Sequence, residues 1–301
     1  MEGTVPKPNF FIVGGPKCGT TALYTYLKNH PEIFMSRIKE PQFFAADIFC
    51  DQRTVQTLAD YLSCFAAARN EKRIGEASTA YLSSRNAAQE IKAFNPNAQI
   101  IIALRNPVEV MYAEHSERVF CNVEHIRTFN AALDSGEQRR WRTGPFKNQK
   151  VIRLRYRDAA RFSQQVGRYF AVFGRENVHV IIYDDFKLNP SNVYRQLLDF
   201  LQVSSGSEID HAVINANRRA RSMAVQDFLR HPPRHVRRFS QFIPRGLRSA
   251  LVGCLHKLNV VYEPRPPMEQ ELRRRLQKEY EPEVEELSRL LDRDLSAWCG
   301  A

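Results

Sequence analysis

Short apolar runs alternate with longer stretches of helical periodicity along the first two thirds of the chain. Four apolar runs are predicted strands because they are short, continuous and bounded by turn residues: "NFFIVGG", "RIGEAS", "QIIIALRN" and "VHVIIYDDF". The periodicity between them predicts helices over residues 20–29, 86–94, 161–173 and 191–201, and one that begins at Pro107. Continuous apolar strands that alternate with helices are typical of a mostly parallel sheet covered on both faces. We therefore expect a three-layer α/β fold.

The last third of the chain has a different character. Residues 214–260 are rich in arginine and proline and carry only short apolar patches, so we expect an arginine-rich loop region without a core strand. Residues 267–298 follow as one or two charged amphipathic helices. Because the chain has 301 residues and no internal repeat, we expect residues 1–301 to form a single domain.

The net charge of the chain predicts an anionic partner. The formal net charge is +11 and the pI is near 9.5, which favours nucleotides, sulfated substrates, nucleic acid or an acidic membrane surface. The N-terminus has no basic segment followed by an apolar core of signal-peptide length. No stretch approaches the ~20 apolar residues of a membrane span. We expect a cytoplasmic protein without integral membrane association.

The six cysteines give no sign of a zinc site, because they are scattered and form no C-x-x-C pair. Cys50 and Cys64 are candidates for a disulfide in an oxidising compartment. Reduced thiols are the expectation for a cytoplasmic protein.

The stretch "GGPKCGTT" is the first candidate for chemistry. It joins a predicted strand to a predicted helix, and the free N–H groups and dipole of a helix N-terminus make such a turn an anion site. Gly14 and Gly19 keep the spacing of the nucleoside-triphosphate loop G-x-x-x-x-G-K-[ST], but Thr20 stands where that loop has its lysine. The lysine here is Lys17, in the middle of the loop. A plain strand–helix turn with an exposed lysine is the less specific alternative.

A second candidate follows the strand in "IIIALRNPVEV". Arg105 leaves the carboxyl end of this strand, which is the edge where ligands bind in open α/β sheets. A triphosphate hydrolase has an aspartate there to hold Mg²⁺. An arginine binds an anion directly through its planar fork. A surface arginine in an ion pair is the alternative.

Together these two stretches resemble the sulfotransferases that use 3'-phosphoadenosine 5'-phosphosulfate (PAPS). The family's loop motif P-K-x-G-T-T is complete: Pro16, Lys17, Cys18, Gly19, Thr20 and Thr21. The second motif is partial, because Arg105 is present but Ala113 stands where the family has a serine eight positions later. Ser116 lies one helical turn further on and on roughly the same face. Whether Ser116 substitutes is open at this point.

Two further stretches are similar to the heparan-sulfate-type branch of the family and its bacterial relatives. "RIKEPQFF" resembles the K-E-P-x-[FY]-F signature, and "GEASTAYL" resembles the E-K-[ST]-P-x-Y segment with Ala77 in place of lysine. The resemblance runs from about Asn9 to Trp298. It implies a P-loop-like three-layer fold with a central, mostly parallel sheet flanked by helices.

The resemblance also implies the chemistry. PAPS would be the donor, adenosine 3',5'-bisphosphate the product, and no metal would take part. Lys17 would stabilise charge on the leaving phosphate, and Glu76 would act as the base for the acceptor hydroxyl. Lys39 and Glu40 are expected at the substrate. A sugar hydroxyl is the favoured acceptor, with a lipid or small alcohol also open.

The donor contacts implied by the resemblance come from three parts of the chain. A basic loop containing Arg218, Arg219 and Arg221 is expected to close over the 3'-phosphate. The full predicted donor set is Pro16, Lys17, Cys18, Gly19, Thr20, Thr21, Arg105, Ala113, Arg218 and Arg221.

Three alternatives stay open from the sequence. His115 and His125 are rival bases, because histidine titrates near neutrality. A P-loop kinase or NTPase is supported by Asp184 and Asp185, which follow an apolar strand in a position that suits a metal. A polyanion-binding module is supported by the charge, but no nucleic-acid-binding motif accompanies it, and we expect no nucleic-acid partner.

Overall fold

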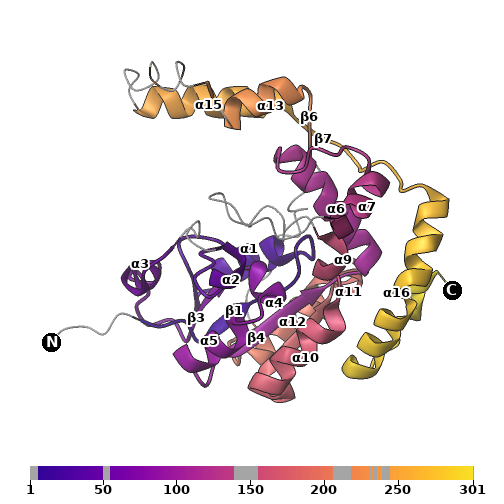
Figure 1. Cartoon of the computed structure of the whole chain (residues 1–301). Coiled ribbons are helices and arrows are strands. Elements are labelled where there is room, and N and C mark those ends of the chain that lie inside the picture. The colour runs from indigo at the N-terminus through magenta and orange to yellow at the C-terminus, as the bar shows by residue number, and fades with distance from the viewer. Residues whose placement is uncertain are drawn as a thin grey trace.

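The computed structural model describes residues 6–49, 55–138, 155–205, 218–230 and 245–300, together with residues 232, 233, 236 and 238. A central sheet of five parallel strands lies between layers of helices (Figure 1). Its strands are β1 (Phe10–Ile12), β2 (Ile33–Met35), β3 (Arg73–Ala77), β4 (Gln99–Leu104) and β5 (Val178–Ile182). The predicted three-layer α/β fold is confirmed, and β2 is a strand that the sequence analysis did not predict.

Five predicted helices are observed, and every bound that was predicted, which for the helix at Pro107 is its start alone, agrees to within one residue. They are α1 (Thr20–Lys28), α5 (Ala87–Phe94), α6 (Pro107–Phe120), α10 (Phe162–Phe173) and α12 (Pro190–Phe200). Other helical segments of the body are short: α2 (Ala46–Phe49), α3 (Leu58–Ser63), α4 (Ala80–Ser83), α7 (Phe129–Gln138), α9 (Tyr156–Ala159), the 3₁₀ turn η2 (Arg175–Asn177) and α11 (Tyr183–Leu188).

The helices cover both faces of the sheet. On one face α1 packs beside α12, where the Tyr194 hydroxyl donates to the carbonyl oxygen of Tyr26 at 3.4 Å. On the other face α10 packs against α4 and α5, and the Tyr169 hydroxyl donates to the carbonyl oxygen of Tyr81 at 2.8 Å. Burial on both faces explains why β1 and β4 read as unbroken apolar runs in the sequence.

The strand order β2-β3-β1-β4-β5 places β1 at the point where the order reverses. Phe11 of β1 is paired with Glu76 of β3 on one side and with Ile100 of β4 on the other. In open parallel sheets, ligands bind at the carboxyl edge of such a switch point. The loops that follow β1, β3 and β4 are therefore brought to one edge of the sheet.

The last part of the chain differs from its prediction. The arginine-rich stretch was expected to be a loop, but its described residues are largely ordered as β6 (Arg218–Ala220), α13 (Met223–Arg230), α15 (Arg245–Asn259) and β7 (Val260–Tyr262). β6 and β7 pair antiparallel, and α13 and α15 project from the body (Figure 1). Arginine and proline obscured a leucine periodicity in α15 that favours a helix.

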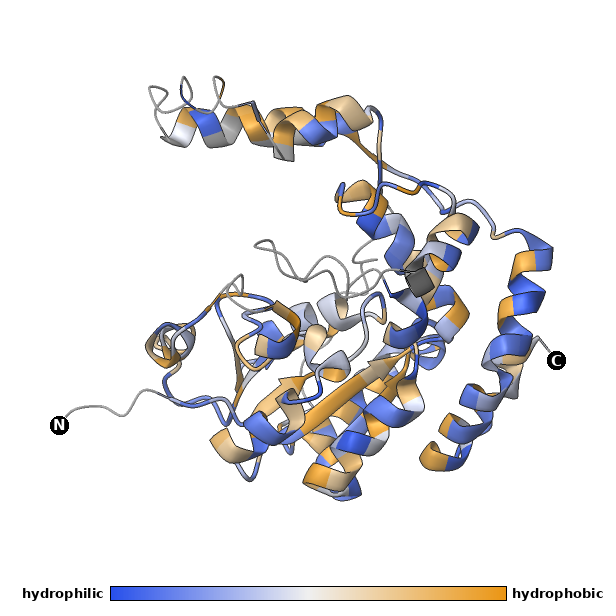
Figure 2. Cartoon of the chain, in the orientation of Figure 1, coloured by the Kyte–Doolittle hydropathy of each residue, from blue (hydrophilic) through white to orange (hydrophobic). Residues whose placement is uncertain are grey.

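The predicted C-terminal helices are one long helix followed by a turn. α16 (Gln270–Leu291) continues through Pro282, packs outside α10, and is followed by the 3₁₀ turn η4 (Ser296–Cys299). Hydropathy in Figure 2 follows this layering, with apolar residues along the sheet and alternating polar and apolar positions along α16. In the part of the chain that the structure describes, no helix is long and apolar enough to cross a membrane.

Candidate active site

The loop between β1 and α1 is held against the backbone of β4. The Gly15 N–H donates to the carbonyl oxygen of Ala103 at 3.0 Å, and the Val13 N–H donates to that of Ile101 at 2.9 Å. A Cβ on Gly14 would stand 2.4 Å from the Ala103 nitrogen. Only glycine therefore lets the loop pass this close to β4.

The same loop has a backbone suited to an anion. Lys17 and Gly19 are left-handed, with φ of 62° and 88°. Turns with such residues form concave arrangements of N–H groups that bind anions. Gly19 caps α1 without a side chain, so the first N–H groups of the helix face the loop beside the hydroxyls of Thr20 and Thr21.

Cys18 lies inside this loop as a neutral, packed thiol. It is 1% exposed, and its Sγ donates to the carbonyl oxygen of Pro16 at 3.4 Å. Burial raises the pKa of the Cys18 thiol far above its usual range. The side chain therefore supports the loop's shape and is not a nucleophile.

Lys17 forms an ion pair with a carboxylate of α6. Its Nζ lies 3.3 Å from Oε2 of Glu117, and the two side chains are 25% and 22% exposed. The lysine is thus held at the mouth of the loop while remaining accessible. A phosphate in the loop would compete with Glu117 for this ammonium group.

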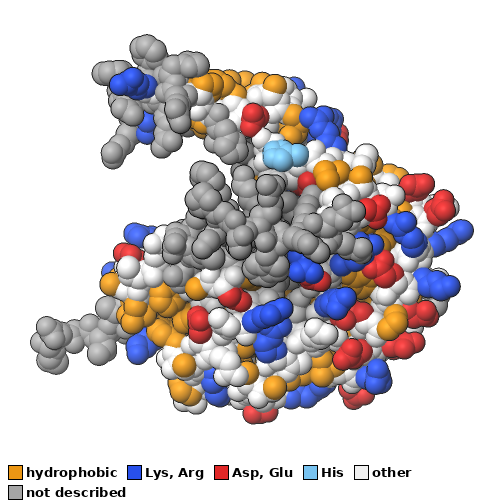
Figure 3. All heavy atoms as spheres, viewed as in Figure 1, with side chains coloured by type: hydrophobic (Ala, Val, Ile, Leu, Met, Phe, Trp, Pro, Cys, Tyr) orange, Lys and Arg blue, Asp and Glu red, His pale blue; other side chains and the backbone are white. Residues whose placement is uncertain are grey.

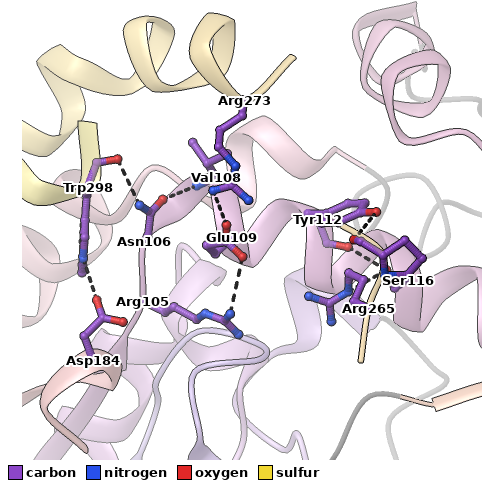
Figure 4. Close-up of polar contacts among 11 residues, drawn as sticks. Arg105, Asn106, Val108, Glu109, Tyr112, Ser116, Asp184, Arg265, Arg273 and Trp298 are labelled. Atoms are coloured by element: carbon purple, nitrogen blue, oxygen red, sulfur yellow. Dashed lines mark hydrogen bonds and ion pairs between the residues drawn. The ribbon is translucent and has the colours of Figure 1, made fainter. Parts of the chain in front are cut away.

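Arg105 lies on the other side of the switch point, directly after β4. Its guanidinium stacks over the ring of Tyr183 at 4.8 Å and lies 3.5 Å from Glu109 (Figure 4). Glu109 is shared with Arg273, whose Nη1 lies 2.6 Å away. Tyr183 also packs beside Gly19, so the ring joins the arginine to the loop. The predicted pairing of the loop with Arg105 is what the fold produces.

Beyond Arg105, the first turn of α6 is tied to the C-terminus and to the carboxylates after β5. Asn106 donates to the carbonyl oxygen of Trp298 at 3.0 Å, and the indole N–H of Trp298 donates to Asp184 at 2.8 Å (Figure 4). Asp185 is paired with Arg293 at 2.7 Å. Asp184 and Asp185 were the basis of the alternative hypothesis of a metal-dependent kinase. Both carboxylates contact side chains near the C-terminus in this structure.

The middle of α6 brings in an arginine that the sequence analysis missed. Ala113, at the family's serine position, is fully buried, whereas the hydroxyl of Ser116 accepts a hydrogen bond from Nε of Arg265 at 2.9 Å. Arg265 also lies over the ring of Tyr112 at 5.4 Å (Figure 4). Burial, and secondarily the positive charge of Arg105, lowers the pKa of Arg265. Two guanidinium groups therefore lie along α6, Arg105 at Glu109 and Arg265 at Ser116, and such a pair suits a doubly charged anion.

Glu76 lies at the end of β3, as predicted, but its carboxylate is enclosed. It is 0% exposed and accepts hydrogen bonds from the hydroxyls of Tyr61 at 2.6 Å, Ser78 at 2.7 Å and Tyr81 at 2.9 Å. Burial raises the pKa of Glu76 to about 7, against the lowering effect of the three hydroxyls. An acceptor hydroxyl cannot reach this carboxylate without displacing a neighbouring side chain.

Glu40 presents a second carboxylate at the same edge, and this one is accessible. Its side chain is 31% exposed and lies 3.1 Å from the ammonium group of Lys39. Its backbone is left-handed, with φ of 59°, and its N–H donates to the carbonyl oxygen of Ala77 at the end of β3. Gln42 donates to the same carboxylate at 3.2 Å. The loop after β2 thus holds a charged acid–ammonium pair against the strand that carries the buried glutamate.

Comparison with known protein families identifies the family of this chain. A family model described as "Sulfotransferase domain" matches residues 7–290. The chain belongs to the sulfotransferase family.

Curated proteins similar to this sulfotransferase include a carbohydrate sulfotransferase and a heparan sulfate sulfotransferase. It is 26% identical to carbohydrate sulfotransferase 15 of Homo sapiens over 73% of the chain, and 24% identical to the bifunctional heparan sulfate N-deacetylase/N-sulfotransferase 1 of Caenorhabditis briggsae over 65%. The chain spans 48% and 23% of those two proteins. A crystal structure of a sulfotransferase from Alicyclobacillus acidocaldarius is similar with a TM-score of 0.72 and 28% identity, covering 97% of this chain and 99% of that one.

The arginines of the expected basic loop lie in the small sheet of the sulfotransferase. Arg218 is the first residue of β6, where it is paired with Tyr262, and the backbone N–H of Arg221 donates to Asn259 at 2.8 Å. Arg219 forms an ion pair with Glu263. The described contacts of this segment thus lead to β7 and the start of the C-terminal segment, so its role at the donor stays a prediction.

The two rival histidines differ in exposure. His115 is 4% exposed, and its Nε2 lies 2.9 Å from the carbonyl oxygen of Ile126. His125 is exposed on the connection after α6. The candidate Cys50–Cys64 pairing, against which reduced thiols were expected, falls partly outside the described residues, because Cys50 is not among them.

Proposed function

We propose that this sulfotransferase transfers a sulfuryl group from PAPS to a hydroxyl of an acceptor, with a carbohydrate hydroxyl as the favoured class. The observation that carries the proposal is the position of Lys17, in mid-loop and across the switch point from Arg105. PAPS would supply the sulfuryl group and leave as adenosine 3',5'-bisphosphate. The loop N–H groups, Thr20 and Thr21 would bind the 5'-phosphate end.

Lys17 has two tasks in this proposal. Its ammonium group would bind the 5'-phosphate and stabilise the charge that grows on the leaving oxygen. It is suited to both because it is a mobile point charge on a fixed loop, and its present partner, Glu117, is a single carboxylate at 3.3 Å. Exchange of that carboxylate for a phosphate keeps the lysine paired throughout.

We place the proton acceptor on Glu40 rather than on Glu76. A general base must lie within hydrogen-bond reach of the acceptor hydroxyl. Glu40 is 31% exposed, whereas Glu76 is 0% exposed and has its oxygens occupied by three hydroxyls. The ammonium group of Lys39, 3.1 Å away, holds the Glu40 carboxylate at this edge of the sheet. In this assignment Glu76 positions the end of β3, against which the backbone of Glu40 is held.

Ser116 and Arg265 are proposed to replace the missing serine at Ala113. A 3'-phosphate carries up to two charges, and bidentate arginines are the side chains best suited to it. Arg105 contacts Glu109 in the first turn of α6, and Arg265 of the C-terminal segment donates to the hydroxyl of Ser116 further along the same helix. This set lies on α6 and the C-terminal segment, so it complements the loop that holds the 5'-phosphate.

The acceptor is proposed to be a sugar hydroxyl on the strength of the carbohydrate-modifying relatives. A cavity of about 430 Å³ adjoins the proposed 3'-phosphate set, because Ser116 and Arg265 line it together with Tyr112, Phe129 and Glu269. Ser116 of this lining is the neighbour in sequence of Glu117, the partner of Lys17. Cavities of this size with a few charged groups commonly hold small ligands.

The test is a pair of calorimetric titrations followed by an acceptor screen. Adenosine 3',5'-bisphosphate should bind without Mg²⁺, and ATP should gain no affinity when Mg²⁺ is added. Sulfur-labelled PAPS should then pass its label to saccharides, with lipid and small alcohols as comparison acceptors. Mg²⁺-dependent ATP binding without binding of the bisphosphate would overturn the proposal in favour of a kinase or NTPase.

A further inference from the structure

A pair of helices that the proposed function does not use projects from the body. α13 and α15 pack against each other beyond the two-stranded sheet of β6 and β7, and we refer to them as the arm (Figure 1). In the chain, α12 and β6 come before the arm, and β7 and α16 come after it. The arm is thus an addition to the sheet and its covering helices.

The arm exposes a continuous apolar stripe. Leu247, Leu251, Leu255 and Leu258 are 56%, 51%, 44% and 65% exposed on α15. Their spacing of four, four and three residues puts all four on one face of the helix. Phe228 of α13 is 44% exposed as well. Figure 3 shows apolar side chains along the described part of the arm, whereas charged side chains of both signs cover the body. An apolar row of this length on a soluble protein marks an interaction surface.

The charge of the same stretch is one-sided. From Phe228 to Tyr262 the sequence contains no aspartate or glutamate, but it contains seven arginines and lysines. Two of them flank the leucine stripe of α15: at about 100° per residue, Arg248 projects to one side of the stripe and Lys257 to the other. An apolar face bordered by basic residues is typical of helices that lie in the surface of a membrane.

We propose that the arm binds the surface of an anionic lipid bilayer, with the leucine stripe inserted among the headgroups and the basic residues paired with lipid phosphates. Charge complementarity selects this occupant over a second copy of the chain. A two-fold interface would set one arm against another, and two acid-free basic segments would repel each other. The binding would be peripheral, since no described helix is long and apolar enough to cross a bilayer.

The test is flotation of the full chain with vesicles. Vesicles of phosphatidylcholine are compared with vesicles that contain about one third phosphatidylglycerol, at about 0.1 M salt. The wild type should float with the anionic vesicles and bind the neutral ones at least about tenfold more weakly. The triple variant Leu251→Ser, Leu255→Ser and Leu258→Ser should lose about tenfold or more of that binding. Leu188→Ser is the matched control, because Leu188 is 87% exposed on α11, away from the arm, and it should bind as the wild type does.

The outcomes separate the alternatives. Absence of binding to anionic vesicles would overturn the proposal, and so would binding that the triple variant leaves unchanged. Sedimentation that shows a dimer in the wild type and a monomer in the triple variant would assign the stripe to a second copy instead. Circular dichroism and titration with adenosine 3',5'-bisphosphate show that the variants are folded. Since vesicle binding needs no donor, the proposal is tested independently of the proposed function.

Discussion

The carboxyl edge of the sheet has two sides that are built from opposite charges. On the side of β1 and β4, Lys17 and Arg105 are cations held at loop and strand ends. On the side of β2 and β3, the corresponding positions hold carboxylates, with Glu40 accessible and Glu76 enclosed. An anionic donor is bound by cations, whereas the proton of an acceptor hydroxyl is taken up by a carboxylate. This difference is the basis on which we propose donor binding at the first side and proton removal at the second.

The largest effect is expected from the cationic side. Lys17→Ala should lower the rate of sulfuryl transfer by about 10³-fold or more, because it removes both a phosphate contact and the charge opposite the leaving oxygen. The measurement is the release of adenosine 3',5'-bisphosphate with an acceptor from the screen. Lys28→Ala, an exposed lysine at the end of α1, is the control. A Lys17 variant with unchanged turnover would remove the reason for placing the donor on this side.

Separate substitutions of Glu40 and Glu76 test which of the two is the general base. Glu40→Gln should lower kcat by about 10²-fold or more while leaving the affinity for adenosine 3',5'-bisphosphate intact, as expected for loss of a general base. Glu76→Gln should have a smaller effect on kcat and a larger one on thermal stability. If Glu76→Gln abolishes turnover and Glu40→Gln does not, the base is Glu76, and the hydroxyls around it must open during the reaction.

This side of the site also shows where sequence reasoning ends. The loop between β1 and α1 could be located from the sequence, because it is marked by local features: glycines, a lysine and a helix start. The position of Glu76 at a strand end was predicted too. The enclosure of Glu76 was not predicted. Tyr61 comes from α3 and Tyr81 from α4, and the hydrophobic pattern of a sequence does not show which separate segments come into contact.

The same limit applies to the C-terminal third. Arg265 reaches Ser116 across a separation of 149 residues, which no local motif signals. The arm was expected to be a loop because arginine and proline dominated its composition. The fold class, by contrast, followed from the alternation of buried strands and helices, a pattern set by burial on both faces of the sheet.

Glu76 should make the stability of the fold depend on pH. Its pKa is raised from 4.5 to about 7 in the folded state, so between these values the folded chain binds a proton that the unfolded chain has lost. Stability from this group is then present below about pH 4.5 and is lost as the pH rises through 7, by about 3 kcal/mol in all. Thermal melts from pH 5 to 8 should show a steeper decline for the wild type and for Glu40→Gln than for Glu76→Gln. Parallel curves for all three would mean that Glu76 is ionised throughout.

Arg265 tests whether the cationic side extends to the 3'-phosphate. Arg265→Ala should weaken binding of adenosine 3',5'-bisphosphate by about tenfold, as for loss of one charge-assisted contact, and leave the weaker binding of adenosine 5'-phosphate unchanged. Arg265→Lys should restore part of the difference, and Arg274→Ala on the exposed face of α16 is the control. Equal losses for both nucleotides would show that Arg265 acts on the shape of α6 and not on the 3'-phosphate.

The smallest effect concerns the carboxylate that pairs with Lys17 on the cationic side. Glu117 holds Lys17 at 3.3 Å and would have to release it when a phosphate enters the loop. Glu117→Gln should therefore raise the affinity for adenosine 3',5'-bisphosphate by about twofold to fivefold, the scale of a partly exposed ion pair, with a smaller gain at high salt. Calorimetry at two salt concentrations measures both. A loss of affinity instead would mean that Glu117 positions Lys17 for the donor, and that the cationic side needs a carboxylate of its own.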